Sequence, residues 1–234
     1  MKNIIVKSLL ALAFVGSALS IASANAAVVY SQAVNYSGDG GPYSYNIQQI
    51  ADKFRLAADS VINGITFYGD NFANSFSPSH TFTIRFFNSI GSVPSNSAFY
   101  DTGALSIAAI DTGTLINSYK VFSFSTSLSG PTLLSSTDYW VSIFDTTSNL
   151  NGNTIFRFAD AITTNSFDSG NVFRNTDSGS WSSPLGGSRS QGAFSLLGSA
   201  PESTDVSVPE PGSLVLLGLG LFGFTVSRFK SVKR

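Results

Sequence analysis

The segment from His80 to Phe87, HTFTIRFF, gives the clearest indication of the fold. Large apolar side chains alternate along it with polar ones. The apolar members are Phe82, Ile84 and Phe86, and the polar members are Thr81, Thr83 and Arg85. A side-chain period of two residues is that of a β-strand with one buried and one solvent-facing side. The segment therefore predicts a half-buried strand.

Five more short runs are rich in aromatic and β-branched residues, as strands are. They are Val61 to Tyr68, Lys120 to Phe124, Tyr139 to Phe144, Ile155 to Phe158 and Ala193 to Leu197. Clusters such as SGDGGP and NSIGSVPSN lie between the runs and favour turns. Only Gln48 to Ala58 has a pattern that a helix could share. We expect an all-β fold over residues 27–199, an antiparallel β-sandwich of jelly-roll type.

The chain contains no cysteine, so neither disulfides nor thiolate metal sites can stabilise the fold. Its 20 Phe and 8 Tyr supply large apolar surfaces instead. A body of about 170 residues is long enough to bury one good-sized core. We expect a single domain between the two end segments.

Residues 1–26 have the features of a secretory signal peptide. A positively charged start precedes an apolar core from Ser8 to Ile21, and Ala24 and Ala26 are the small residues that signal peptidase reads. We predict cleavage before Ala27. An uncleaved N-terminal anchor is the alternative, and the short apolar core argues against it.

The C-terminal end has three parts, after a polar linker over residues 200–208. The tripeptide Pro209-Glu210-Pro211 comes first, and an uncharged run from Gly212 to Val226 follows it. A basic tail over residues 228–234 ends the chain, with Arg228, Lys230, Lys233 and Arg234. The two prolines favour an extended backbone, which a processing enzyme can grip.

The uncharged run predicts a single hydrophobic helix over about residues 212–227. Fifteen helical residues span roughly 22 Å, against about 30 Å of bilayer hydrocarbon, so the helix is short for a permanent span. Tilting, or extension of the long basic side chains toward the headgroups, would still allow insertion. The positive charge after the run places the C-terminus in the cytoplasm and predicts a transient anchor in the inner membrane.

The order of motif, short helix and basic tail resembles the PEP-CTERM sorting signal of Gram-negative bacteria. In that family the membrane transpeptidase exosortase recognises the Pro-Glu-Pro motif, removes the tail and passes the protein to the cell surface. The resemblance implies that Pro209, Glu210 and Pro211 are the recognition residues. It also implies a link to extracellular polysaccharide or biofilm. An ordinary C-terminal anchor is the alternative.

Without both ends, residues 27–208 contain seven basic and thirteen acidic residues, a formal charge of −6. Phosphate binding needs clustered Lys and Arg, so this acidic balance argues against a nucleic-acid partner.

Two Asp-Thr-Gly triplets, beginning at Asp101 and Asp111, match the catalytic triplet of aspartic proteases. That mechanism needs two carboxylates that share one proton and come from separate lobes or chains. Triplets this close in sequence instead predict two strand-end turns, in which each Asp bonds its own backbone and each Gly takes a positive φ. His80 is the only histidine, and without a G-x-S-x-G motif it is expected to open a strand.

Two further features suggest ligands. The region around Asp39 could offer oxygen atoms to calcium, but it lacks the spacing of a loop site, and a plain turn is favoured. Trp181, in the loop-like DSGSWSSP, could stack on a sugar, although a packing role is favoured both for it and for Trp140.

The sequence therefore predicts a non-enzymatic protein without metal or cofactor. Its expected partners are signal peptidase, exosortase, the inner membrane and extracellular polysaccharide. A structural or adhesive surface role is the first hypothesis. A lectin-like carbohydrate-binding module is the second, and a hydrolase is the third.

Overall fold

The structure is a computed structural model that describes residues 26–37, 40–76, 80–147, 152–162, 171–182 and 191–201. The prediction of a signal peptide falls almost wholly outside these ranges, and the predicted sorting motif, helix and basic tail fall entirely outside them.

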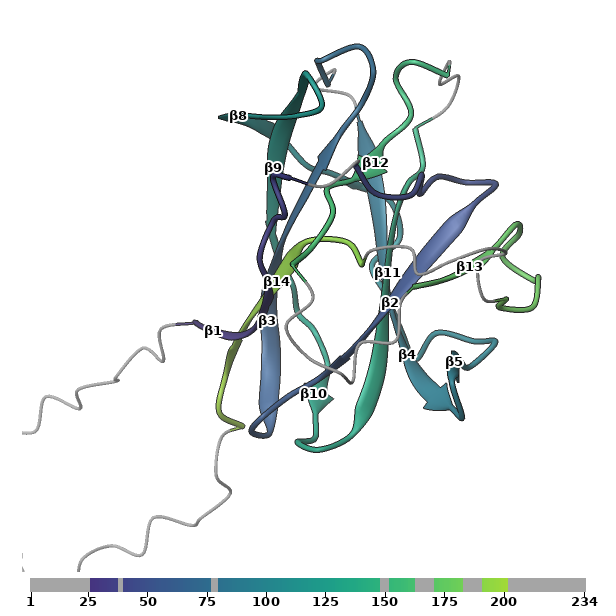
Figure 1. Cartoon of the computed structure of the whole chain (residues 1–234). Helices are drawn as coiled ribbons and strands as arrows, with labels where there is room; N and C mark the ends of the chain where they lie inside the picture. The colour runs from purple at the N-terminus through teal and green to yellow at the C-terminus, as the bar shows by residue number, and fades with distance from the viewer. Residues whose placement is uncertain are drawn as a thin grey trace, which may run out of the picture. The chain divides into compact units, whose positions relative to one another are not determined.

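Every regular element in the described ranges is a β-strand. The strands are β1 (Ala27–Gln32), β2 (Gln49–Arg55), β3 (Ser60–Asp70), β4 (Thr81–Ile90), β5 (Val93–Pro94), β6 (Tyr100–Asp101), β7 (Leu105–Ser106), β8 (Ala109–Ile116), β9 (Tyr119–Ser127), β10 (Thr132–Leu133), β11 (Asp138–Asp145), β12 (Arg157–Phe158), β13 (Val172–Arg174) and β14 (Phe194–Ser199). They form two sheets that face each other (Figure 1). The ladders between these strands are antiparallel, which confirms the all-β, sandwich-like expectation.

The first sheet, called here the β3 sheet, has the order β1-β14-β3-β9-β8, and β10 and β12 also pair with β3. The last strand of the body lies between the first strand and β3. Ser195 on β14 is therefore opposite both Ser31 on β1 and Thr66 on β3. Pairing of strands this far apart in sequence makes the sheet depend on contacts across the whole body.

The second sheet, called here the β4 sheet, has the order β13-β2-β11-β4-β5, and β6 and β7 also pair with β4. Its central strand β11 has partners on both sides, since Val141 is opposite Asp52 on β2 and Phe86 on β4. The chain changes sheet at each of the steps β1 to β2, β2 to β3 and β3 to β4. Consecutive strands therefore pack face to face.

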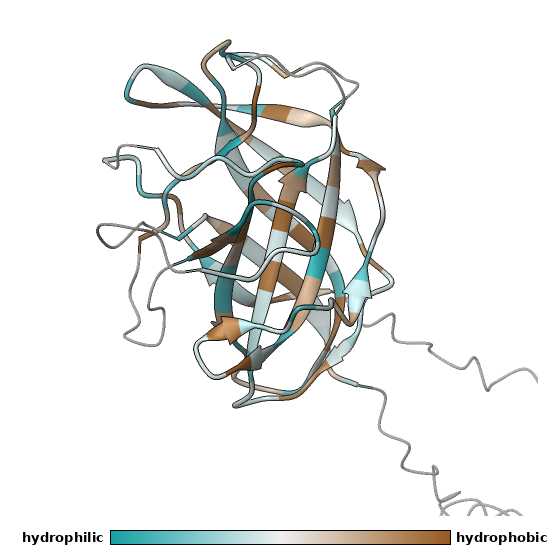
Figure 2. Cartoon of the chain, turned by 90° about the vertical axis from the view of Figure 1, so that its right-hand side faces the viewer, coloured by the Kyte–Doolittle hydropathy of each residue, from teal (hydrophilic) through white to brown (hydrophobic). Residues whose placement is uncertain are grey.

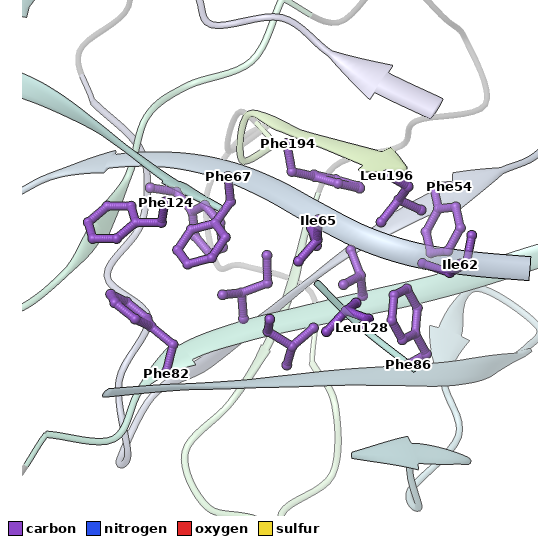
Figure 3. Packing of buried hydrophobic residues seen from close by; sticks show 14 of the residues in the cluster. Phe54, Ile62, Ile65, Phe67, Phe82, Phe86, Phe124, Leu128, Phe194 and Leu196 are labelled. Carbon is purple, nitrogen blue, oxygen red and sulfur yellow. The ribbon is translucent and has the colours of Figure 1, made fainter. Parts of the chain in front are cut away.

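The main core fills the space between the sheets (Figure 3). Phe67 on β3, Phe124 on β9 and Phe82 on β4 have no exposed surface. The Phe67 and Phe124 rings stack with centroids 5.0 Å apart, and the Phe82 ring meets Phe67 edge-on at 5.1 Å. Removing these large side chains from water stabilises the folded state, and ring packing of this kind stabilises it further.

The prediction that Phe82, Ile84 and Phe86 share the buried side of β4 is confirmed, because all three are fully buried. Hydropathy alternates along the long strands of the body (Figure 2). The expectation of a solvent-facing outer side is wrong, because Thr83 is only 4% exposed and Phe87 is fully buried. A second, smaller core covers this outer side and is described below.

All six predicted strands overlap strands of the structure. The weakest match is Ile155 to Phe158, of which only the last two residues are extended as β12. The ambiguous segment Gln48 to Ala58 contains β2 and no helix. The sequence did not indicate β1, β8 or β13.

Within the described ranges, no helix has the length and apolarity that a membrane crossing would require.

Candidate functional site

A second cluster of buried side chains lies on the outer side of the β4 sheet. Its members are Ala51, Phe87, Trp140, Val172 and Trp181. Trp140 is 1% exposed, and its indole N–H donates to Ser89 Oγ at 3.1 Å, which confirms a core position.

Trp181 closes this cluster from a segment that follows β13. The side chain is 7% exposed and meets the Phe87 ring edge-on, with centroids 5.4 Å apart. The Arg174 guanidinium lies over the Trp181 ring at 4.5 Å, and the indole N–H donates to the Ser95 carbonyl at 3.3 Å. Sugar stacking needs an open ring face, and Arg174 covers one of the two. Packing is the role that this geometry shows.

Two arginines and two aspartates meet beside that cluster, in a cleft of about 280 Å³ that we call the arginine cleft. Arg85 Nε donates to Asp101 Oδ2 at 2.7 Å, and its two terminal nitrogens donate to Asp177. The Arg174 side chain is 2% exposed, and its Nε donates to Gln49 Oε1 at 2.9 Å. Its ion pair with Asp177 is longer, at 3.4 Å.

The charges in the arginine cleft balance within the chain. Burial alone would lower the pKa of Arg85, but hydrogen bonds to Asp177 and Asp101 outweigh it and raise the pKa. Burial lowers the pKa of Arg174, although Asp177 opposes this change. The hydrogen bonds from Arg85 lower the pKa of Asp177.

This balance determines what the arginine cleft can do. An external anion would have to displace the Asp177 carboxylate, which already accepts from both arginines and from the Gln49 amide. Asp177 belongs to the exposed segment between β13 and Trp181. The ion pairs therefore fasten that segment to the β4 sheet.

The two Asp-Thr-Gly triplets form separate turns in different sheets. Asp101 ends β6 and accepts the Gly103 N–H at 2.8 Å, and Asp111 accepts the Gly113 N–H at the same distance. Both glycines have positive φ, +63° and +74°, as predicted. The expected strand-end position is wrong for Asp111, which lies inside β8 at a register shift.

His80 immediately precedes β4 and is 3% exposed. Its Nδ1 lies 2.7 Å from Asp145 Oδ2 at the end of β11, a pair that sequence reasoning did not find. The partners are 65 residues apart, and only the pairing of β4 with β11 brings them together. Thr146 N–H also donates to the Thr81 carbonyl, so the pair reinforces a junction between two strands.

No group of three or more His, Cys, Asp or Glu that could hold a metal occurs in the part of the chain that the structure describes. Asp39 lies outside that part, so the calcium alternative stays a prediction. Ala24 and the sorting-motif residues also lie outside it, whereas Ala26 is exposed and Ala27 begins β1.

Comparison with curated proteins gives no match. Comparison with protein families gives a match over residues 207–228 to the PEP-CTERM protein-sorting motif. The matched range contains Pro209, Glu210 and Pro211, the uncharged run and the first tail arginine. On this match, the chain carries the sorting signal of PEP-CTERM proteins at its C-terminal end.

Proposed function

We propose that this chain is an exported protein whose C-terminal signal is processed by exosortase, and whose β-sandwich body is delivered to the cell surface or the extracellular matrix. The observation that carries the proposal is the match of residues 207–228 to the PEP-CTERM sorting motif. Before processing, the helix over about residues 212–227 holds the protein in the inner membrane, with the basic tail in the cytoplasm.

The start of the body is consistent with export. Strand β1 begins at Ala27, the residue that signal peptidase would leave as the new N-terminus. Among the described residues, the first that pairs in the β3 sheet is Ala27, opposite Gly198. The mature protein would therefore retain every strand that the structure describes.

We further propose a jelly roll as the body's topology. Strands β1-β14-β3-β9 face β2-β11-β4 with β6 and β7 paired to β4, and the chain crosses between the sheets at successive steps. A jelly roll also consists of two antiparallel layers between which the chain crosses repeatedly, and it is an architecture shared by capsid and lectin domains. Here β8 extends one layer, and β13 and β5 extend the other.

For the exported body we propose a structural or adhesive role in extracellular polysaccharide or biofilm, without catalysis. The carboxylates that suggested a protease have other partners, since Asp101 bonds Arg85 and Asp111 bonds Lys120 at 2.8 Å. The large proportion of buried aromatic side chains supports a stable scaffold. A carbohydrate-binding module remains the second candidate, and the site that favours it is argued below.

The decisive test replaces Glu210 with Gln, which keeps the size of the side chain and removes its charge. A carboxylate between two prolines offers a charge-assisted hydrogen bond worth about 1.5–3 kcal/mol. Its loss should weaken engagement by exosortase roughly tenfold to hundredfold. With tags on the body and on the extreme C-terminus, immunoblots of membrane and surface fractions should show the variant retained in the membrane with its tail attached.

Glu202 provides a matched control, because it also follows a proline but lies in the linker, outside the matched range. Glu202→Gln should be processed like the parent. Equal processing of Glu210→Gln and the parent would show that the charge is not recognised. If deletion of the whole tripeptide also had no effect, the tail would be a simple anchor and the sorting proposal would fall.

A further inference from the structure

A pocket of about 270 Å³ lies on the outer side of the β3 sheet, on the face opposite the main core; we call it the tyrosine pocket. Residues of three elements line it: Ser31 and Gln32 on β1, Tyr68 on β3 and Ser195 on β14, together with Tyr36 from the segment after β1. None of its lining residues carries a charge.

Two tyrosines of different exposure give the pocket its aromatic surface. Tyr36 is 50% exposed, so much of its side chain is open to solvent. Tyr68 is partly buried and packs against a small apolar cluster that includes Val34 and Ala193. An exposed ring beside an anchored one provides apolar faces with hydroxyl groups at their tips.

Hydroxyl groups continue from the pocket across the sheet. Ser31 on β1, Ser195 on β14, Thr66 on β3 and Ser125 on β9 are directly opposite one another in successive ladders. Their side chains therefore share one face and span three inter-strand gaps, about 14 Å. We call these four residues the hydroxyl row. Ser31 and Ser195 hydroxyls lie 2.8 Å apart, and those of Thr66 and Ser125 lie 2.9 Å apart.

This chemistry selects a class of ligand. Serine and threonine hydroxyls both donate and accept, and they rotate to suit a partner. An anion would meet no cation among the lining residues and would approach a body whose formal charge is −6 over residues 27–208. A neutral sugar matches both features, since it has hydroxyls for the row and C–H faces for the tyrosine rings. The volume is small for a ligand pocket and suits one unit of a chain.

We infer that the tyrosine pocket and its hydroxyl row bind a neutral polysaccharide chain, with Tyr36 as the stacking residue. This inference rests on the proposed association with extracellular polysaccharide and names the surface responsible for it. Tyr36 takes the sugar-stacking role that the sequence left open as the lesser alternative for Trp181, one ring face of which Arg174 covers.

The test uses the full-length chain in detergent on an array of neutral and acidic oligosaccharides. The parent should bind neutral glycans and leave acidic ones blank. Tyr36→Ala should weaken binding about tenfold, as loss of an aromatic anchor does. Tyr36→Phe retains the ring face and should keep most of the binding. Phe99→Ala removes a second exposed aromatic, 40% exposed, outside the pocket and should have no effect.

The outcomes separate this site from the wider proposal. Neutral binding that Tyr36→Ala and Phe99→Ala leave equally strong would refute the site and keep the polysaccharide role. A blank array for a correctly folded parent would refute both. Binding of acidic glycans alone would overturn the neutral class. Thermal unfolding of each variant shows whether a loss of binding reflects a loss of fold. The sorting proposal is tested separately, by the processing of the Glu210→Gln variant.

Discussion

Phe86 shows how single side chains hold the two sheets together. It is fully buried, and its ring meets Phe54 edge-on at 6.0 Å and Tyr100 at 5.7 Å. Truncation to Ala would remove this burial and leave a cavity that neighbours fill only in part. We expect Phe86→Ala to lower the free energy of unfolding by about 3–5 kcal/mol, measured by urea denaturation.

Phe99→Ala is the matched control for this truncation, because it deletes the same atoms from a side chain that is 40% exposed. It should cost much less, since less surface returns to water. Thr83→Ala, which the half-buried model of β4 would suggest as the control, is unsuitable because Thr83 is only 4% exposed. Equal costs for the two phenylalanines would contradict the assigned inner face.

Local sequence predicted which residues of β4 face inward, because an alternating pattern depends only on neighbours along the strand. It could not predict the setting of Trp181. That side chain lies in a polar segment, and its burial depends on Phe87 and Arg174, which reach it through the pairing of β13 with β2 and of β4 with β11. The His80–Asp145 pair has the same long-range origin.

At the scale of the strand, β3 contains a glycine that a close approach requires. A Cβ at Gly69 would overlap the Phe156 ring and come within 2.5 Å of the Arg157 carbonyl. β12 pairs directly with this part of β3, so neither neighbour can move freely. We expect Gly69→Ala to destabilise the fold by about 1–3 kcal/mol, as overpacking does. Differential scanning calorimetry would show a lower Tm.

Gly64 in the same strand is the internal comparison. A Cβ there would meet the Thr126 carbonyl at 3.1 Å and a Leu197 methyl at 3.3 Å. The methyl belongs to a side chain that can shift slightly. Gly64→Ala should therefore lower the Tm less than Gly69→Ala does. The reverse order would show that the approach of β12 does not limit β3.

The elements that sequence predicted were those with dense aromatic and β-branched residues, such as β3, β4 and β11. β8 was not predicted, because Asp111 and Gly113 form a local turn inside the strand, where the pairing with β9 shifts register. The turn chemistry was correctly predicted, but its position within a strand was not. A bulge of this kind depends on the neighbouring strand, which local composition does not reveal.

At the scale of the molecule, the two ends of the body meet in one sheet. β14 lies between β1 and β3, so the β3 sheet is complete only when the chain up to Ser199 is present. The matched sorting motif begins eight residues later, at residue 207. Because strands distant in sequence must find one another, we expect the body to fold slowly for its size.

The charge of the body makes its stability depend on pH. Asp138 at the start of β11 accepts from Lys53 Nζ at 2.6 Å and from Arg55 Nε at 2.7 Å, both on β2. Burial alone would raise the pKa of Asp138, but the two cations outweigh it and lower the pKa. The free energy from this pairing is therefore present above the unfolded pKa of about 3.9 and is lost as pH falls through the folded value.

Asp138→Asn should test this linkage in whole-molecule unfolding. At pH 6 the variant should be less stable than the parent by about 1 kcal/mol, the upper range for partly exposed ion pairs. At pH 2.5 the difference should shrink, because the unfolded parent takes up a proton below about pH 3.9, whereas the lowered pKa of Asp138 makes the folded protein resist that proton. Urea denaturation of both proteins at pH 6 and at pH 2.5 measures this difference.

Lys53→Met removes one of the two cations that pair with Asp138. It should therefore make the stability of the protein depend less on pH in the same window. A difference between parent and Asp138→Asn that stayed constant from pH 6 to 2.5 would show that the pairing of β2 with β11 depends on the shape of Asp138, and that its charge contributes nothing.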